Sequence, residues 1–439
     1  MSDSATVDVI RQAIDAAPDR RLTFAQYMEL ALYHPEVGYY SRGRGLGAGG
    51  DFATSVHLCA DFGETIAIQL AEMWQTLDRP ECFDLVEMGA GQGILAGDVL
   101  RALRRDEPGC FAAVQYRIVE KSASLKRLQQ KQLAEFADKT TWCELGEIGN
   151  GAIVGCCLSN ELLDAFPVHR VSFRDGQLQE IYVSYDADER FCEILDMPST
   201  PAIASYFADA NIDICNRNLA ESASANAPRT SNVRRDYPDG YTTEVNLAAK
   251  DWVAQISRIL DRGYVLTIDY GYDTDRYYAP VRHDGTLNCY SQHRHHPDPY
   301  VNPGQQDITA HVDFGAIERW GEAAGLATVG RTQQALFLMA LGWGDRLASL
   351  GRGGFGGLGS LGGLSPTQPD SAATSTDITR VFQRHQVLRD AIDPQGLGGF
   401  QVLVQEKRGT PDETIDGAAS DPTPSKRSQL TGLTFPAMP

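Results

Sequence analysis

The sequence predicts an α/β protein built on a largely parallel sheet, and three observations lead to that prediction. Between about residues 80 and 165, short apolar strands alternate with amphipathic helical segments, a pattern typical of parallel strands joined by crossover helices. A glycine-rich junction, Gly89-Ala-Gly91-Gln-Gly93, joins the first strand to the helix that follows it. The alternation returns after about residue 244, so we expect one sheet assembled from two stretches of the chain.

The segment that precedes the sheet, residues 1–79, is predicted to be helical and rich in glycine. Apolar residues recur at helical spacing over residues 6–33 and again over residues 59–77. Between these stretches, residues 43–51 are dense in glycine. A glycine-dense loop can close over a bound molecule, so Gly43–Gly50 is a candidate lid.

The first part of the core, residues 80–167, contains four predicted strands and the helices between them. The strands are predicted over residues 83–88, 114–119, 141–147 and 152–159, and the helices over residues 94–105 and 122–136. A further helical start is predicted over residues 161–165. Ligands bind outside the carboxyl ends of such strands, so we expect the functional site at that edge.

An inserted subdomain is predicted over residues 168–243. Its first part alternates like a small antiparallel meander, with a turn at Arg174-Asp-Gly, and its second part is polar and irregular. The core then resumes in residues 244–407. Its predicted elements are a helix over residues 245–260 and strands over residues 264–268, 327–336 and 400–406.

Two stretches near the C-terminus are predicted to lack regular structure. Residues 351–376 are rich in Gly, Ser, Thr and Pro, a composition typical of a flexible loop. The polar tail, residues 408–439, is predicted to be disordered because it offers little apolar surface to bury.

The charge balance excludes several classes of partner. The chain has 439 residues with 39 Lys+Arg and 58 Asp+Glu, a formal charge of −19. Broad nucleic-acid binding depends on a basic surface, and docking on an anionic membrane does too, so neither is expected. Apolar stretches fall short of the roughly 20 residues that a membrane span needs. We therefore expect no nucleic-acid partner and no membrane insertion.

The cellular location is predicted from the N-terminus and the cysteines. A basic leader followed by an apolar segment is absent, and Asp3, Asp8 and Asp15 are unusual in a mitochondrial transit peptide, which is poor in acids. The nine cysteines include no CxxC pair, so we interpret them as reduced thiols. Together these features predict a cytoplasmic protein.

The glycine junction favours one class of cofactor over another. A dinucleotide-binding loop has the spacing GxGxxG, which would need a third glycine at position 94, where the chain has Ile94. Here the spacing is GxGxG, and Glu87 stands two residues before Gly89. A carboxylate would repel a pyrophosphate, whereas S-adenosylmethionine (SAM) has no phosphate and carries an ammonium and a sulfonium. We therefore expect SAM, held by Glu87, Gly89, Gly91 and Gly93.

Polar residues also follow the next strands at the same edge of the sheet. Glu120 follows the second strand, where a carboxylate could accept both ribose hydroxyls of an adenosyl cofactor. Asn160 and Glu161 emerge from the fourth strand, and Asp269 from the fifth. The alternatives are that the glycines make only a tight turn beside solvated acids, and that Asn160 only caps a helix. The histidines of His293-Arg-His-His296 have no acid or cysteine at ligand spacing, so no metal site is expected.

An ordered series of motifs now adds a resemblance. The segments are Leu32-Tyr-His-Pro35, Gly38-Tyr-Tyr40, Gly50-Asp-Phe52, Glu87-Met-Gly-Ala-Gly-Gln-Gly93, Asn160-Glu-Leu-Leu-Asp-Ala165, Ile268-Asp-Tyr-Gly271 and Asp307-Ile-Thr-Ala-His-Val-Asp-Phe314. With this series, the chain from about residue 20 to residue 407 resembles the MidA-like family of SAM-dependent methyltransferases. That family includes the mitochondrial complex I assembly-factor methyltransferases. The resemblance implies a seven-stranded Rossmann-like methyltransferase sheet with an N-terminal helical segment and an inserted subdomain.

The resemblance also implies a substrate. Mitochondrial members of the family are protein arginine methyltransferases that act on a complex I subunit, so the expected partner is an arginine-bearing protein, with a complex I-type subunit as the hypothesis. A guanidinium is oriented by carboxylates that bind it through paired hydrogen bonds. The candidate carboxylates are Glu161, Asp164, Asp269 and Asp51, with Glu161 first, and Asn160 is expected beside the cofactor. Two rival hypotheses remain, an NAD-dependent oxidoreductase and a non-catalytic assembly chaperone that binds SAM.

Overall fold

The computed structural model describes residues 4–42, 59–212, 237–291, 294–355, 375–409 and 430–435. Its largest part is a seven-stranded sheet with the order β16-β17-β10-β5-β2-β3-β4. Five neighbouring strands pair in parallel, and β17 runs antiparallel to both β10 and β16. The strands are β2 (Phe83–Met88), β3 (Val114–Val119), β4 (Thr140–Cys143), β5 (Ile153–Asn160), β10 (Leu260–Asp269), β16 (Ala327–Gln333) and β17 (Gln401–Lys407).

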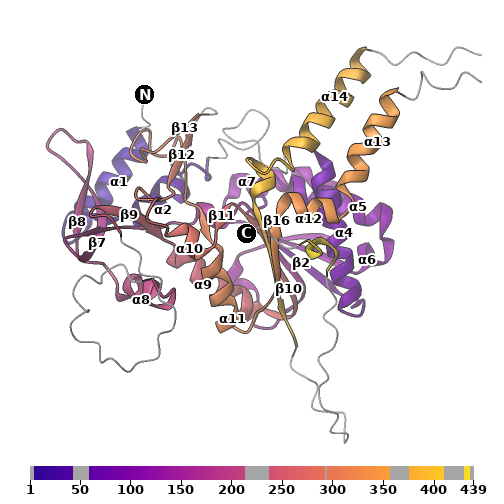
Figure 1. The fold of residues 1–439 in the computed structure, drawn as a ribbon, viewed down its shortest axis with the longest axis horizontal. Helices are drawn as coiled ribbons and strands as arrows, with labels where there is room; N and C mark the ends of the chain where they lie inside the picture. The colour runs from indigo at the N-terminus through magenta and orange to yellow at the C-terminus, as the bar shows by residue number, and fades with distance from the viewer. Residues whose placement is uncertain are drawn as a thin grey trace, which may run out of the picture.

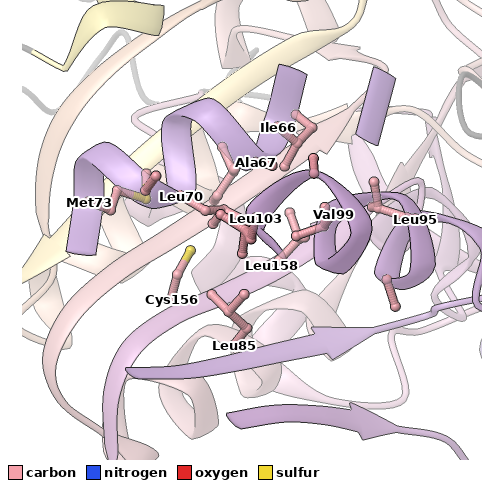
Figure 2. Packing of buried hydrophobic residues seen from close by; sticks show 14 of the residues in the cluster. Ile66, Ala67, Leu70, Met73, Leu85, Leu95, Val99, Leu103, Cys156 and Leu158 are labelled. Atoms are coloured by element: carbon pink, nitrogen blue, oxygen red, sulfur yellow. The ribbon is translucent and has the colours of Figure 1, made fainter. Parts of the chain in front are cut away.

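Helices cover both faces of this sheet. One face packs against α4 (Ala60–Thr76), α5 (Ile94–Asp106) and α6 (Pro108–Ala113), and the other against α9 (Leu247–Ile259) and α11 (Phe314–Ala323). In Figure 2, Leu85 and Leu158 of the sheet point towards Val99 and Leu103 of α5, with α4 above them. Strands buried on both faces become almost continuously apolar, which is why β5 reads as an apolar run.

The N-terminal segment and the predicted insertion share a second sheet. Its order is β1-β7-β6-β9, with β8 paired to β7. The strands are β1 (Leu22–Thr23), β6 (His169–Arg174), β7 (Gln177–Tyr185), β8 (Phe191–Asp196) and β9 (Tyr241–Val245). The helices α1 (Ser4–Ala16), α2 (Phe24–Tyr33) and α8 (Pro201–Asp209) belong to this region, which lies to the left of the main sheet in Figure 1. Segments that are about 160 residues apart in sequence therefore fold together, because Leu22 and Thr23 pair with Val183 and Tyr182.

Short strands connect the two regions near the carboxyl edge of the main sheet. One small sheet has the order β13-β12-β14, and β11 pairs with β15 in parallel. Their bounds are β11 (Gly271–Tyr272), β12 (Asn288–Ser291), β13 (Arg294–His296), β14 (Asp307–Thr309) and β15 (Val312–Asp313), with α10 (Thr274–Tyr277) between β11 and β12. The backbone N–H of Ala310 donates to the carbonyl of Asp164 at 2.9 Å, which ties β14 to the turn after β5.

Most predicted elements of the core agree with the structure, and the differences lie at their ends. The helix predicted over residues 122–136 is α7 (Ala123–Gln132) followed by a 3-10 turn, and the strand predicted over residues 141–147 ends at Cys143. The strand predicted over residues 327–336 ends at Gln333, where α12 (Gln334–Ala340) begins. Gln334 donates its side-chain amide to the carbonyl of Ala391, an interaction that local periodicity cannot show.

The two stretches predicted to lack structure contain ordered residues at their ends. The helix α13 (Trp343–Phe355) extends into the stretch of residues 351–376, and α14 (Ser375–Asp390) begins within it. These helices run side by side away from the sheet in Figure 1. In the tail, Leu430 and Leu433 are buried in the core beside α4, and the carboxylate of Glu72 accepts the N–H of Thr431 at 2.9 Å. The prediction of a wholly disordered tail is therefore wrong for residues 430–435, because this short apolar sequence has a place to dock.

Candidate functional site

The glycine loop after β2 has the backbone that a close approach to a ligand requires. Gly89, Gly91 and Gly93 have φ of 72°, 52° and 79°, in the left-handed region that favours glycine. A Cβ at Gly89 would lie 2.9 Å from the Leu162 side chain, whereas a Cβ at Gly91 would meet no described atom within 4 Å. Gly91 therefore faces open space at the carboxyl edge of the sheet.

Glu120 lies beside this loop and is tied to it. It follows β3, and its carboxylate accepts the N–H of Ser122 at 2.7 Å and the amide of Gln129 at 2.8 Å. The same Gln129 amide donates to the carbonyl of Gly91 at 2.9 Å. Burial raises the pKa of Glu120, and these hydrogen bonds oppose the shift. The predicted neighbours Gly91 and Glu120 are thus brought together, as a site for an adenosine ribose would need.

The sequence predicts that Glu87 holds the cofactor, but its side chain is buried in the core. Its side chain is 3% exposed, lies on the sheet face that packs against α4 and α5, and accepts the hydroxyl of Tyr116 at 2.8 Å. Burial raises the pKa of Glu87 to about 7, and the Tyr116 hydroxyl limits the shift. Glu87 is therefore buried in the core near the end of β2, and its role as a cofactor ligand remains a prediction.

The end of β5 presents polar groups without a complete set of partners. The amide of Asn160 donates to Glu161 at 3.2 Å, and Asn160 Oδ1 is buried with no hydrogen-bond partner among the described residues. Glu161 has φ of 52°, a conformation that costs a non-glycine residue energy and often marks a functional position. The 3-10 turn that follows has Leu162 at its N-cap and no side-chain cap, so the reading of Asn160 as a helix cap is wrong.

Asp164 lies in that turn and is the most deeply buried candidate that still has an open acceptor. Its Oδ2 accepts the Tyr270 hydroxyl at 2.7 Å, and its Oδ1 is buried without a partner among the described residues. Burial raises the pKa of Asp164 to about 6. In the part of the chain that the structure describes, no arginine or lysine pairs with this carboxylate. It is a site suited to a cation from outside the chain.

Asp269 is placed close to Asp164 but is used differently. Its Oδ2 accepts the backbone N–H groups of Leu162, Leu163 and Asp164 at 3.1, 2.9 and 3.4 Å, and its Oδ1 accepts that of Tyr270 at 2.9 Å. Burial and the neighbouring carboxylates raise the pKa of Asp269, while the backbone donors oppose the shift. Its geometry is that of a positioning residue that holds the 162–164 turn.

Three predicted features lie wholly or partly outside the described residues. Asp51 and the candidate lid Gly43–Gly50 lie wholly outside, so their roles stay predictions, and the histidine cluster lies partly outside because His293 does. His295 and His296 belong to β13. Across the described ranges, no group of three or more His, Cys, Asp or Glu is gathered where it could hold a metal ion.

Sequence reasoning missed a second set of polar residues at the same edge. The Tyr40 hydroxyl donates to Asp307 Oδ1 at 2.7 Å, and the Tyr33 ring stacks on Tyr40 with centroids 5.4 Å apart. The Tyr33 hydroxyl donates to the carbonyl of Ala165 at 2.8 Å. Tyr33, the last residue of α2, therefore reaches the turn after β5, and Tyr40 reaches the first residue of β14. A signal was available, since Tyr40 and Asp307 both lie in the quoted motifs, but spacing along the chain does not show that they meet.

The site residues fit SAM as cofactor. Asn160 Oδ1 is a buried acceptor without a partner among the described residues, and the ammonium of SAM could donate to it. Gly91 leaves room beside Glu120, whose carboxylate is at hand for ribose hydroxyls. Glu87, two residues before the loop, would oppose a pyrophosphate in its ionised form. The geometry thus agrees with a cationic adenosyl cofactor better than with a dinucleotide.

Fold and site together define an α/β methyltransferase, and comparison with known proteins agrees. A family model described as "Putative S-adenosyl-L-methionine-dependent methyltransferase" matches residues 65–332, and the chain belongs to this family. A protein from Burkholderia thailandensis, crystallised with S-adenosyl-homocysteine, is 28% identical and superposes with a TM-score of 0.74 over 98% of this chain and 95% of its own. The protein is therefore a SAM-dependent methyltransferase, as predicted.

Curated relatives carry more specific names. "Protein arginine methyltransferase NDUFAF7 homolog, mitochondrial" from Drosophila melanogaster is 29% identical over 74% of this chain and 72% of its own length. The human protein arginine methyltransferase NDUFAF7, mitochondrial, is 26% identical over 75% and 72%. The likeness to the MidA-like family is thus confirmed.

The same names correct the predicted location. The relatives from fly, mouse and human are all named as mitochondrial proteins, so the prediction of a cytoplasmic protein is wrong. That prediction depended on the acids Asp3, Asp8 and Asp15 and on cysteine spacing, which report on a leader and on disulfides but not on the compartment in which a folded enzyme works.

None of the helices in the described parts of the chain combines the length and the apolar character needed to cross a membrane.

Proposed function

We propose that this methyltransferase is a protein arginine N-methyltransferase whose substrate-facing carboxylates are Glu161 and Asp164. The observation that carries the proposal is Asp164 Oδ1, a buried oxygen that has no hydrogen-bond partner among the described residues. Asp164 comes three residues after Glu161, whose backbone is strained, at the end of β5. The names of the curated relatives support an arginine-bearing protein as the substrate. A complex I-type subunit is the particular substrate that the resemblance implies.

The proposed cofactor residues come from the adjoining strands. Gly89, Gly91 and Gly93 provide the close backbone approach, Glu120 accepts the ribose hydroxyls, and Asn160 accepts from the ammonium; Glu87 lies buried two residues before the loop. When bound, SAM supplies a methyl group on a sulfonium centre. The protein's part is to align the nucleophile, about 3–3.5 Å from the methyl carbon, and to exclude water.

The carboxylates act on the guanidinium. Two oxygens that accept hydrogen bonds from one guanidinium fix its plane and draw positive charge away from the nitrogen that attacks. Asp164 is suited to this because Tyr270 fixes its orientation at 2.7 Å and leaves the second oxygen open. Asp269 holds the turn on which Asp164 stands. Asp51 remains a further candidate, outside the described residues.

The test uses the full-length protein, SAM labelled on its methyl group, and a mitochondrial extract from cells that lack the enzyme. Mass spectrometry of the labelled protein identifies the modified residue. We expect label on arginine with the wild type and at least about a hundredfold less with Glu161→Gln, since a charge-assisted hydrogen bond is lost. SAM affinity should be unchanged.

A matched control is Glu322→Gln, because Glu322 is exposed near the C-terminal end of α11. It should methylate like the wild type. Label on lysine or on no protein residue would contradict the proposed substrate. Full activity in Glu161→Gln would contradict the role of that residue. Wild-type binding of SAM and of a partner without any methyl transfer would instead favour the assembly chaperone.

A further inference from the structure

The turn between β14 and β15 fixes His311 against the two residues of the proposed arginine site. Immediately before it, the backbone N–H of Ala310 donates to the carbonyl of Asp164 at 2.9 Å. Immediately after it, the backbone N–H of Val312 donates to the carbonyl of Tyr270 at 3.0 Å. His311 is therefore held on both sides by Asp164 and Tyr270.

The imidazole ring of His311 lies between two tyrosine rings. Its centroid is 5.1 Å from that of Tyr270, with the two rings nearly perpendicular at 88°, and 5.0 Å from that of Tyr272. The Tyr270 hydroxyl donates to Asp164 Oδ2 at 2.7 Å. The half-buried imidazole thus contacts the ring whose hydroxyl orients the buried carboxylate.

One ring nitrogen of His311 has no partner. Nδ1 is buried and makes no hydrogen bond within the described parts of the chain, although the backbone N–H of the same residue donates to the Thr286 hydroxyl at 3.1 Å. Buried polar atoms are nearly always paired, and an unpaired one beside a reactive site points to a chemical task. In a neutral imidazole with its proton on Nε2, Nδ1 has a free lone pair.

The surroundings of His311 keep the imidazole neutral. Burial and the cation of Arg282 lower the pKa of His311 to about 4. The Arg282 guanidinium lies over the Tyr272 ring, 4.0 Å from its centroid, and that of Arg276 lies 4.6 Å from the same centroid. The ring is therefore free to accept a proton at neutral pH, and Arg282 disfavours keeping it.

Methylation of an arginine side chain needs a group that takes one proton. The attacking nitrogen forms a bond to the methyl carbon while the bond from that carbon to sulfur breaks, and the electron pair of the broken bond stays on sulfur. The nitrogen then has four bonds and is strongly acidic, so a weak base is enough to remove its proton. The methylated guanidinium keeps one positive charge, and the acceptor gains one.

We propose that His311 is the proton acceptor of the methyl transfer, and that its Nδ1 takes the proton from the attacking nitrogen while Asp164 holds the guanidinium. Asp164 stays ionised throughout, because it is the charge partner of the substrate before and after the step. The proton then passes from His311 to solvent. The inference rests on the proposed function for the nature of the nucleophile, and it adds the destination of the proton.

The experiment removes the ring and replaces it with small bases. His311→Ala takes away the imidazole that packs against Tyr270. The full-length variant is given SAM labelled on its methyl group and a mitochondrial extract from cells that lack the enzyme. The rate of arginine labelling is measured without addition, with imidazole and with pyrazole, which has the shape of imidazole but is a far weaker base.

The variant should lose at least about a hundredfold in rate, the usual contribution of a general base. Isothermal titration calorimetry should show that it binds SAM like the wild type. Imidazole should restore labelling and pyrazole should not. The control is His283→Ala, which removes an exposed imidazole between α10 and β12 and should label at the wild-type rate with or without imidazole.

The outcomes distinguish this inference from the proposed function. A wild-type rate in His311→Ala overturns the inference, while label on arginine in the wild type keeps the proposed function. A lost rate that both bases restore equally, or that neither restores, also overturns it, because His311 would then only fill space beside Tyr270. Label on lysine, with rescue by imidazole alone, would refute the arginine substrate and keep His311 as the acceptor.

Discussion

The cofactor side and the substrate side of this molecule are built in opposite ways. The proposed cofactor side is mostly local: Glu87, the glycine loop and Glu120 belong to β2-α5-β3 and the residue that follows it, and only Asn160 comes from β5. The proposed substrate side depends on distant segments: Asp164 after β5 is oriented by Tyr270, and Asp269 at the end of β10 holds its turn. A local site can be copied among many enzymes, whereas an assembled site can change its specificity by changing one contributing segment.

The two sides also differ in how their acids are partnered. Glu120 is satisfied by Ser122 and Gln129, and Glu87 by Tyr116. Asp164 has a buried oxygen without a described partner. The acids of the proposed cofactor side are thus paired before binding, whereas Asp164 on the proposed substrate side keeps a buried acceptor whose cost is relieved only when a cation arrives.

The largest effect should come from filling the cofactor side. Gly91→Val places a branched side chain into the open space beside the loop and should reduce SAM affinity by at least about a thousandfold, roughly 4 kcal/mol. Isothermal titration calorimetry measures this. The control is Gly176→Val in the β6–β7 turn, where φ is 76° and a Cβ also meets no described atom within 4 Å. Both variants carry backbone strain, so equal SAM binding in the two would show that the loop is not the cofactor site.

A second variant tests the residue that holds the turn carrying Asp164. Asp269→Asn replaces a carboxylate that accepts four backbone N–H groups with an amide whose nitrogen cannot accept, and should lower the free energy of unfolding by about 2–3 kcal/mol. Urea unfolding measures the loss. Methyl transfer per folded molecule should fall as well, because the turn that carries Asp164 is released. If stability falls but methyl transfer per folded molecule does not, Asp269 does not position the site.

Stability far from the site should change without any effect on binding. Leu430→Ala removes a side chain that is 1% exposed in the core beside α4 and should cost about 2 kcal/mol, the low end for buried leucine because the chain end can relax. Thermal unfolding measures it. Leu128→Ala, at a position 45% exposed, should be nearly neutral. If Leu430→Ala instead weakens SAM binding, the docked tail is coupled to the site.

The smallest effect is on pH dependence. Burial raises the pKa of Asp164 to about 6, so this carboxyl is protonated below that pH and cannot pair with a guanidinium. The kcat/KM for the protein substrate should therefore fall about tenfold for each pH unit below 6, roughly 1.4 kcal/mol. Folding stability changes in the opposite direction. Because folding raises the pKa of Asp164, the free energy of unfolding falls as the pH rises from about 4 to about 6. Asp164→Asn should abolish this fall in kcat/KM below pH 6. If the fall persists in the variant, another group causes it.

What could be predicted from the sequence follows the same division. Strands β2 and β3 match their predicted bounds because their apolar runs end abruptly at Glu87-Met-Gly and at Glu120. The pairing of Glu120 with the loop could be anticipated, since parallel strands end at one edge. The contact between Tyr40 and Asp307 could not, because it depends on how α2 and β14 are placed by the core they share. The roles of Asp164 and Asp269 differ only in where each carboxylate points, which no spacing reveals.

The position of β17 has a consequence for how the chain is made. This strand is the last in sequence among the seven, yet it lies between β10 and β16 and pairs with both. Until residues 401–407 leave the ribosome, β10 and β16 have no partner on their facing edges, and unpaired edges favour association with other chains. Ribosomes stalled before this strand should hold nascent chains that need chaperones, and release of the last residues should end that need.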